Sequence, residues 1–273
     1  MQYDGTHVLC QATGGHGGRN GGCHQVELAG KRAVITGAGS GIGKATAIAM
    51  ADAGAAVVVS DVNDEGGRQT VERIVAAGNT ASFIHCDTAI DDEVAELVRA
   101  TVDALGGLDL AVNNVGVADP VSDLHESAIE DFDRSVGITL RGTYLCMRAE
   151  LAHMVEHGGG AIVNTASGAG IKNAIGMPAY TAAKHGVVGL TKHAGQQYAA
   201  RNIRVNCVCP GSIATEGMLA APEEMLDTWT KLIPMGRMGT PQEIADAIVF
   251  LLSDRASFLT SVALPIDGGY FYA

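Results

Sequence analysis

The sequence predicts a single doubly wound α/β domain in which a mainly parallel sheet of about seven strands is flanked by helices. Three observations support this class. Short apolar runs alternate with helical patterns along most of the 273 residues, their connections are short, and most of the apolar runs are nearly continuous. Continuous apolar runs are typical of strands buried on both faces of a parallel sheet. Regular β-α-β order is typical of a doubly wound domain, and this length fits one domain.

The expected elements follow one another in strict alternation. The strands are expected at Ala33–Thr36, Ala56–Ser60, Ala81–His85, Leu108–Asn113, Gly160–Ala166, Ile203–Cys209 and Val262–Ile266. The helices are expected at Gly41–Ala53, Asp64–Ala77, Asp91–Leu105, Ser127–Glu156, Pro178–Ala200 and Pro241–Ser253. Asp91, Asp92 and Glu93 place negative charge on a first helical turn, where the macrodipole favours it. Pro241 suits a first helical position.

The charge balance excludes several classes of partner. Lys and Arg number 18 against 30 Asp and Glu, which gives a formal net charge of −12. Such a surface repels nucleic-acid phosphates and anionic lipids. The sequence has no uncharged apolar run long enough for a membrane-spanning helix, and its first residues lack the basic and apolar regions of a secretory signal. We therefore expect a cytoplasmic protein with no nucleic-acid or membrane partner.

The six cysteines are too sparse for a disulfide framework, which agrees with a reducing cytoplasm. Cys207 and Cys209 share one face of an expected strand, and we interpret them as two small buried apolar side chains rather than metal ligands. Residues 1–28 contain seven glycines and little to bury, so they are predicted to be a flexible tail before a domain at 29–273. The spacing of Cys10, His16, Cys23 and His24 in this tail matches no standard zinc finger. No metal site is expected.

A glycine-rich turn follows the first expected strand. Residues 36–43 read TGAGSGIG and lead directly into a helix. Glycines permit a tight turn and let backbone N–H groups approach a pyrophosphate at the helix N-terminus. A glycine string alone is weak evidence, but its place between a strand and a helix is typical of a Rossmann-type dinucleotide domain. The candidate cofactor-binding residues of this turn are Gly37, Ser40, Gly41, Ile42 and Gly43.

Asp61 ends the second expected strand, 24 residues after Gly37. A carboxylate at this place can accept hydrogen bonds from both hydroxyls of an adenosine ribose, and it repels a 2′-phosphate. The next residues, Val62 and Asn63, are not cations that could bind such a phosphate. The sequence therefore favours NAD(H) over NADP(H). The structural alternative is an exposed aspartate in a turn.

Tyr180 and Lys184 lie four residues apart at the start of an expected helix, so their side chains share one face. The pKa of free tyrosine, near 10, is too high for a base at neutral pH. An adjacent ammonium and a positively charged nicotinamide both favour the phenolate, so we expect the pKa of Tyr180 to be lowered. Ser167 directly follows an expected strand, at the carboxyl edge where α/β sheets bind ligands. Its hydroxyl can hold a substrate oxygen.

These motifs, in this order, resemble those of the short-chain dehydrogenase/reductase family over about nine-tenths of the chain, from about Glu27 to the end. The residues that carry the resemblance are TGAGSGIG at 36–43, NNVG at 113–116, Ser167, YTAAK at 180–184 and NCVCPGSIAT at 206–215. The resemblance implies that Tyr180 is the general acid/base, that Lys184 binds the nicotinamide ribose and lowers the Tyr180 pKa, and that Ser167 orients the substrate oxygen.

The resemblance also implies further cofactor contacts after the later strands. They are Val62, Cys86, Asp87, Thr88, Asn114, Val115, Gly116, Pro210, Gly211, Ile213 and Thr215, together with Tyr180 and Lys184.

Three positions depart from the family pattern. Val115 stands where the family usually has Ala, and Thr260-Ser261 stand where Thr-Gly is usual. Thr139 stands where the family has a fourth catalytic residue, an Asn that helps to hold a water linked to the lysine. Thr can bind a water but has one donor and a shorter reach, so we predict a functional but altered proton relay. Thr139→Asn should raise the turnover rate or leave it unchanged.

The resemblance implies a mobile lid over the substrate near residues 212–239. This segment is rich in methionine and other apolar residues, which suggests a medium-sized, fairly apolar alcohol or ketone, a class that includes cyclic and steroid-like compounds. Core or subunit contacts are an equally good interpretation of these residues. The family usually assembles as tetramers, so a homotetramer through Ser127–Glu156, Pro178–Ala200 and the C-terminal strand is expected.

The sequence thus favours an NAD-dependent short-chain alcohol dehydrogenase or carbonyl reductase that transfers a hydride between NAD(H) and a secondary alcohol or ketone. One alternative is an NADPH-dependent 3-oxoacyl-type reductase, which Asp61 disfavours. An enoyl reductase fits less well, because its tyrosine and lysine lie further apart than Tyr180 and Lys184. A non-catalytic NAD-binding protein is a third alternative, which the intact Ser167, Tyr180 and Lys184 disfavour.

Overall fold

A single parallel sheet forms the centre of the molecule. The computed structural model describes residues 27–272. The seven strands lie in the order β3-β2-β1-β4-β5-β6-β7, and every neighbouring pair is parallel. Their bounds are β1 Arg32–Thr36, β2 Ala56–Asp61, β3 Ala81–His85, β4 Leu110–Asn113, β5 Gly160–Thr165, β6 Ile203–Pro210 and β7 Ala263–Ile266. The strand order reverses between β1 and β4, as in a doubly wound sheet, so the predicted fold class is confirmed.

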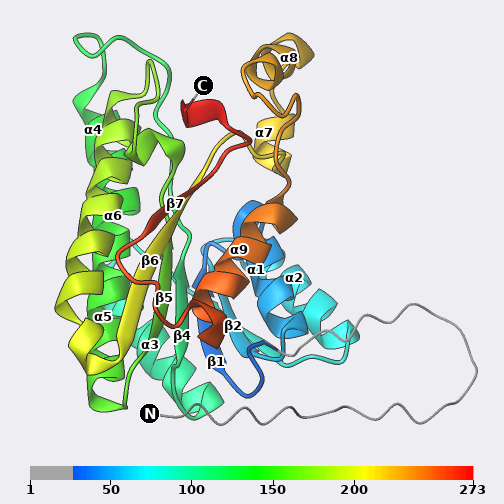
Figure 1. Ribbon diagram of the computed structural model, residues 1–273, viewed down its shortest axis with the longest axis vertical. Coiled ribbons are helices and arrows are strands. Elements are labelled where there is room, and N and C mark those ends of the chain that lie inside the picture. Colours follow the sequence, from blue (N-terminus) through cyan, green and yellow to red (C-terminus); the bar gives the residue numbers. More distant parts are fainter. Residues whose placement is uncertain (1–26, 273) are drawn as a thin grey trace, which may run out of the picture.

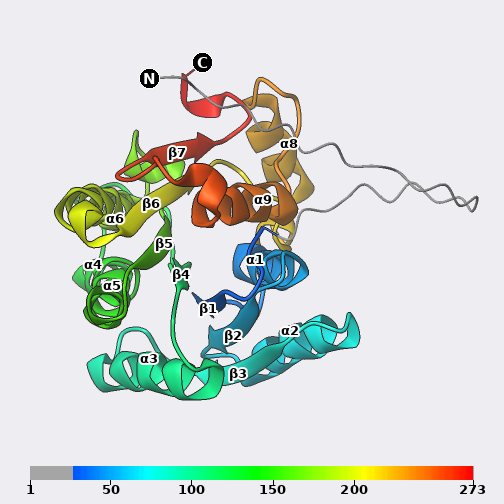
Figure 2. The ribbon, with the colours of Figure 1, turned by 60° about the horizontal axis from the view of Figure 1, so that its bottom comes forward.

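Helices cover both faces of this sheet. Figure 2 shows α1, α2 and α9 on one side of the strands and α3, α5 and α6 on the other. The helices are α1 Gly41–Asp52, α2 Asp64–Ala76, α3 Asp91–Leu105, α4 Ile129–Ser135, α5 Gly142–Glu156, α6 Pro178–Gln197, α7 Glu216–Leu219, α8 Glu223–Lys231 and α9 Pro241–Leu252. Figure 1 shows α4, α7, α8 and the C-terminal end gathered at one end of the molecule.

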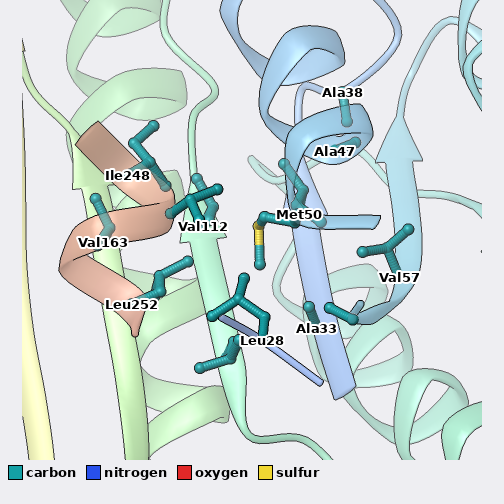
Figure 3. Packing of buried hydrophobic residues seen from close by; sticks show 14 of the residues in the cluster. Leu28, Ala33, Ala38, Ala47, Met50, Val57, Val112, Val163, Ile248 and Leu252 are labelled. Carbon is teal, nitrogen blue, oxygen red and sulfur yellow. The ribbon is translucent and has the colours of Figure 1, made fainter. Parts of the chain in front are cut away.

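The strands supply a core to each helical layer because successive side chains of a strand point to opposite faces. In β1, Ile35 packs into the cluster that contains Met50 of α1 and Ile248 of α9. Its neighbour Val34 packs into the opposite cluster, against α3 and α5. Figure 3 shows Met50 near the middle of the first cluster. Strands buried on both faces explain why their sequences read as continuous apolar runs.

The predicted elements differ from the structure mainly at their ends. The first strand starts at Arg32, whose backbone and guanidinium both donate to Asp109 at 2.7 to 2.9 Å. The long helix predicted at Ser127–Glu156 begins at Ile129 and is interrupted by a π-helical turn at Val136–Arg141. Such turns are rare and often occur at functional sites, and hydrophobic periodicity does not reveal them.

The boundary of the predicted tail needs a correction. Residues 1–26 lie outside the described residues, and with them Cys10, His16, Cys23 and His24. Leu28, however, is fully buried in the core beside Met50, and Glu27 forms an ion pair with Arg255. The packed domain therefore includes Leu28, which the sequence prediction assigned to the tail.

Two further expectations concern cysteines and membrane spans. Cys207 and Cys209 are both fully buried in β6, as predicted for small apolar side chains. Across residues 27–272, no helix has the length and apolar character that a bilayer crossing requires.

Candidate active site

A cleft of about 650 Å³ opens at the carboxyl ends of the strands. Its walls come from the turns after six of the strands, from α6 and α7, and from the π-helical turn. Every predicted cofactor-binding residue except Gly43 lines this cleft, and Ser167 lines it as well. Gly43 and Thr139 lie outside the lining. Residues from opposite ends of the chain thus meet at the edge where parallel sheets bind ligands.

Glycine backbone angles and close contacts between backbone atoms determine the shape of the turn after β1. Gly37 and Gly41 have φ values of +61° and +53°, a region that favours glycine. A Cβ on Gly43 would lie 2.0 Å from the carbonyl oxygen of Gly37, so any side chain there would displace the turn. Asn114 fixes the same carbonyl, because its Nδ2 donates to Gly37 O at 3.0 Å. Gly43 therefore serves the packing of α1 against the turn.

This turn fits the pyrophosphate of a dinucleotide. Ser40 stands at the N-cap of α1, and within the described residues no side-chain hydrogen bond caps this helix. Its first N–H groups and positive dipole end thus suit an anion. The hydroxyls of Thr88 and Thr165, both on the cleft wall, are buried without a hydrogen-bond partner among residues 27–272. A bound polar ligand could satisfy these two hydroxyls, so the residues present fit a nicotinamide dinucleotide.

Asp61 is held at the rim of the cleft by two backbone amides. Its carboxylate accepts hydrogen bonds from Gly39 N and Asn63 N, each at 2.8 Å. A Cβ on Gly39 would lie 2.9 Å from Asp61 Oδ2, so the glycine permits this approach. Val62 beside it is exposed. The arrangement places a negative charge on the same cleft as the glycine turn.

Lys184 is buried beneath the cleft, with 3% of its surface exposed. Its Nζ donates to Thr165 O at 2.7 Å. A Cβ on Gly116 would lie 2.9 Å from this Nζ, so Gly116 leaves the space that the ammonium occupies. Burial lowers the pKa of Lys184 to about 8. The ammonium lies 5.6 Å from the ring centroid of Tyr180.

Tyr180 and Ser167 face each other at the cleft. Ser167 stands at the end of β5, where its Oγ accepts a hydrogen bond from Ala169 N at 3.1 Å. The pKa of Tyr180 is raised, first by burial and also by the charge of Asp119, while a hydrogen bond with Ser167 lowers it. The sequence prediction of a lowered pKa is thus wrong for the protein alone, because burial outweighs the hydrogen bond.

Thr139 is fully buried in the π-helical turn. Its Oγ1 accepts a hydrogen bond from Val117 N at 3.1 Å, so the hydroxyl holds the loop that follows β4. The sequence analysis did not find Asp119 or Thr165, whereas Met218 belongs to the apolar segment predicted as the lid. Thr165 and Met218 line the cleft, and Asp119 binds the first turn of α6. Thr165 could have been predicted from its place at the end of a strand, but Asp119 belongs to no local sequence pattern.

The comparison with family models is consistent with this geometry. Residues 37–271 match the family model described as "Enoyl-(Acyl carrier protein) reductase". The match runs from the glycine turn to the end of the domain. The chain belongs to the short-chain dehydrogenase/reductase family. Members of this family use a nicotinamide cofactor, NAD or NADP.

Relatives within the family act on alcohols. The chain is 44% identical to cyclohexanol dehydrogenase from Acinetobacter sp. over 240 residues, which cover 88% of this chain and 94% of the relative. It is 42% identical to 2,5-dichloro-2,5-cyclohexadiene-1,4-diol dehydrogenase from Sphingobium indicum, covering 89% and 98%. The crystal structure of levodione reductase superposes with a TM-score of 0.87 at 34% identity and covers 90% of this chain and 99% of that one. This short-chain dehydrogenase/reductase is an oxidoreductase of the alcohol dehydrogenase type.

Proposed function

We propose that the protein is an NAD-dependent dehydrogenase that interconverts a cyclic, fairly apolar secondary alcohol and its ketone. The observation that carries this proposal is the grouping of Ser167, Tyr180 and Lys184 at one cleft that also contains the glycine turn and Asp61. Two relatives are named for alcohols of six-membered carbon rings, which supports a substrate of that class. Met218 adds an apolar side chain to the cleft wall.

The residues divide the chemistry between them. In alcohol oxidation, Ser167 holds the substrate hydroxyl and the Tyr180 phenolate takes its proton. In ketone reduction, the Tyr180 phenol returns the proton to the ketone oxygen. Lys184 supplies positive charge beside the phenol and would bind the ribose hydroxyls of a dinucleotide. A nicotinamide dinucleotide held at this cleft would supply the hydride acceptor for oxidation and the hydride donor for reduction. Because burial raises the Tyr180 pKa, we expect oxidation by this enzyme to accelerate toward alkaline pH.

An activity assay tests the proposal. Cyclohexanol with NAD should give reduced nicotinamide, and Tyr180→Phe should lower kcat/KM by roughly 100-fold or more, the usual contribution of a general acid/base. Tyr180→Phe should still bind NAD, as measured by calorimetry. Tyr198→Phe is the matched control, because Tyr198 lies at the far end of α6, outside the cleft lining, where it lines a groove with residues of α5. Equal turnover by Tyr180→Phe and wild type would remove Tyr180 from the acid–base role.

The preference for NAD is proposed from Asp61. Asp61→Asn keeps an oxygen that can accept from Gly39 N but removes the charge that repels a 2′-phosphate. We expect the ratio of kcat/KM for NAD over NADP to fall about 10-fold to 100-fold, which corresponds to about 1.5–3 kcal/mol for a charged hydrogen bond. A wild-type enzyme that prefers NADP would contradict the role proposed for Asp61.

We further propose a homotetramer, a cytoplasmic location and a substrate lid. A groove of about 480 Å³ between α5 and α6 is lined by Tyr144, Leu151, Val155 and Leu190 among others, which supports assembly of these helices with further copies as a tetramer. Light scattering that gives a monomer would contradict it. The cysteines at 86, 146, 207 and 209 are free, which supports a reducing cytoplasm. Residues 212–239, with α7 and α8, are proposed as the substrate lid.

A further inference from the structure

Asp119 lies in the loop between β4 and α4 and is buried, with 6% of its surface exposed. Its carboxylate reaches a helix that begins about 60 residues later in the chain. Oδ2 accepts a hydrogen bond from Ala179 N at 2.9 Å, and Oδ1 accepts one from Tyr180 N at 2.7 Å. A buried carboxylate with both oxygens on backbone amides is a specific contact.

The first turn of α6 depends on this carboxylate. The first N–H groups of a helix have no partner inside the helix. Met177 stands at the N-cap and, within residues 27–272, provides no side-chain hydrogen bond, while Pro178 has no N–H. Ala179 and Tyr180 are the donors that remain before Thr181, whose N–H bonds to Met177 O at 3.0 Å. Asp119 therefore takes the place of a local N-cap, and its charge suits the positive end of the helix.

The loop that carries Asp119 is itself held on its other side. Val117 N donates to Thr139 Oγ1 at 3.1 Å, and the Ser135 hydroxyl donates to Val117 O at 3.3 Å. Thr139 and Ser135 belong to the π-helical turn and to the end of α4. Hydrogen bonds thus join these elements to the loop at Val117, and two residues later Asp119 joins the loop to the backbone of Tyr180.

We propose that Asp119 is a positioning residue for Tyr180, which holds the first turn of α6 so that the phenol stays beside Ser167 and which places a fixed negative charge near the phenol. This inference rests on the proposed function, in which Tyr180 is the acid/base. Three groups from three elements act on the phenol: Asp119 from the loop after β4, Ser167 from the turn after β5, and Lys184 from α6. The charge of Asp119 raises the pKa of Tyr180, whereas the Ser167 hydrogen bond lowers it.

The test compares Asp119→Asn, Asp119→Glu and Asp119→Ala with the wild-type enzyme. Asp119→Asn removes the charge that raises the Tyr180 pKa, so the pH profile of kcat/KM for cyclohexanol oxidation should shift to lower pH. Its plateau should fall about 10-fold, and that of Asp119→Ala about 100-fold, because small misplacements of a catalytic group cost up to about that factor. Asp119→Glu keeps the charge, so its pH profile should have the same midpoint as that of the wild type, even if its plateau value of kcat/KM falls.

A control separates positioning from helix stability. Thr240→Ala removes the capping box of α9, where Thr240 and Glu243 bond reciprocally. It should lower the melting temperature as a lost cap does, and leave both the plateau and the pH profile unchanged. If the three Asp119 variants lower only the melting temperature, and the profile and plateau equal those of the wild type, Asp119 is a structural cap and the proposal is wrong.

A second measurement needs no substrate. In protein labelled with ¹³C at the tyrosine Cζ, the chain's six tyrosines give few signals, and Tyr180→Phe identifies the one from Tyr180. Its titration should move to lower pH in Asp119→Asn and stay in place in Asp119→Glu. If the titration shifts in this way but the wild-type enzyme oxidises no alcohol, the proposed function is wrong and the charge effect of Asp119 on Tyr180 still holds. An unshifted titration in Asp119→Asn would overturn the inference.

Discussion

The two walls of the cleft are built in different ways. On the wall formed by the glycine turn, polar groups hold one another in place, as Asn114 holds Gly37 and Asp61 holds Gly39. The wall formed by α7 is different: α7, and α8 that follows it outside the cleft lining, contain no buried residue within the range 27–272. Apolar side chains of these two helices, such as Leu219 and Met225, are about half exposed. Backbone contacts thus constrain the first wall, while the side chains of the second wall could be replaced to suit different substrates without disturbing the core.

The largest effect should come from adding a methyl group to the constrained wall. In Gly43→Ala the new Cβ would meet Gly37 O at 2.0 Å and Asn114 Nδ2 at 2.7 Å. We expect the unfolding free energy to fall by about 3 kcal/mol, the upper range for overpacking, and NAD binding to weaken with it. Urea unfolding and calorimetry measure both. Gly189→Ala is the control, because a Cβ there has no neighbour within 4 Å among the described residues.

The second prediction concerns a buried polar network beneath the constrained wall. Glu150 of α5 is 1% exposed and accepts a hydrogen bond from Asn113 Nδ2 at 3.0 Å, which also donates to Asn164. Burial raises the pKa of Glu150 to about 7. A carboxyl with a raised pKa in the folded state stabilises the fold at low pH, and this contribution is lost as the pH rises from the unfolded value through about 7.

In the wild type, ionisation of Glu150 should lower the free energy of unfolding by about 2 kcal/mol between about pH 5 and about pH 8. Glu150→Gln should show no such decrease. The variant should be more stable than the wild type at about pH 8, and the difference should shrink toward about pH 5. Denaturant unfolding at several pH values measures it. Glu156→Gln, at the exposed end of α5, should leave the pH dependence unchanged. Parallel curves for wild type and Glu150→Gln would show that Glu150 ionises freely in the fold.

The third prediction concerns the wall formed by α7. Met218→Ser removes the apolar side chain that α7 contributes to the cleft. We expect KM for cyclohexanol to rise about 10-fold, which matches a loss of about 1.4 kcal/mol of apolar burial. The affinity for NAD and the melting temperature should stay constant, since α7 has no buried residue in the described chain. Met225→Ser is the matched control on α8, outside the cleft lining. A large loss of NAD affinity in Met218→Ser would contradict the division between the walls.

The same division explains what the sequence could predict. The fold and the constrained wall follow from local patterns, because a buried strand and a glycine turn each leave a signature in adjacent residues. The predicted residues of the glycine turn other than Gly43 line the cleft for this reason, and the contacts that the family resemblance implied line it as well. The missed features depend on contacts between distant segments. Asp119 caps a helix from another loop, and Arg32 extends β1 through Asp109, so no window of sequence shows either partner.

The expected lowering of the Tyr180 pKa failed for a related reason. The spacing of Tyr180 and Lys184 indicates a shared helix face, but it does not show how far each side chain is desolvated. Burial lowers the pKa of Lys184 to about 8 and raises that of Tyr180. In water, an ammonium and a phenolate favour each other's charged forms, which lowers the pKa of the phenol and raises the pKa of the ammonium. Both directions are reversed in this fold. Desolvation depends on the whole fold, so sequence spacing gives only the sign of the pairwise attraction.

The smallest predicted effect tests whether Thr139 belongs to the constrained wall. Its hydroxyl accepts from Val117 N, so Thr139→Val keeps the shape of the side chain but leaves a partly buried amide without its partner. We expect the unfolding free energy to fall by about 1 kcal/mol. The pH profile of Tyr180 should change little, because Asp119 keeps its own bonds to α6. Thr139→Ser retains the hydroxyl and should match the wild type in urea unfolding. A large drop in kcat for Thr139→Val at constant stability would instead support the proton relay predicted from the family pattern, since a relay needs the hydroxyl and a loop support does not.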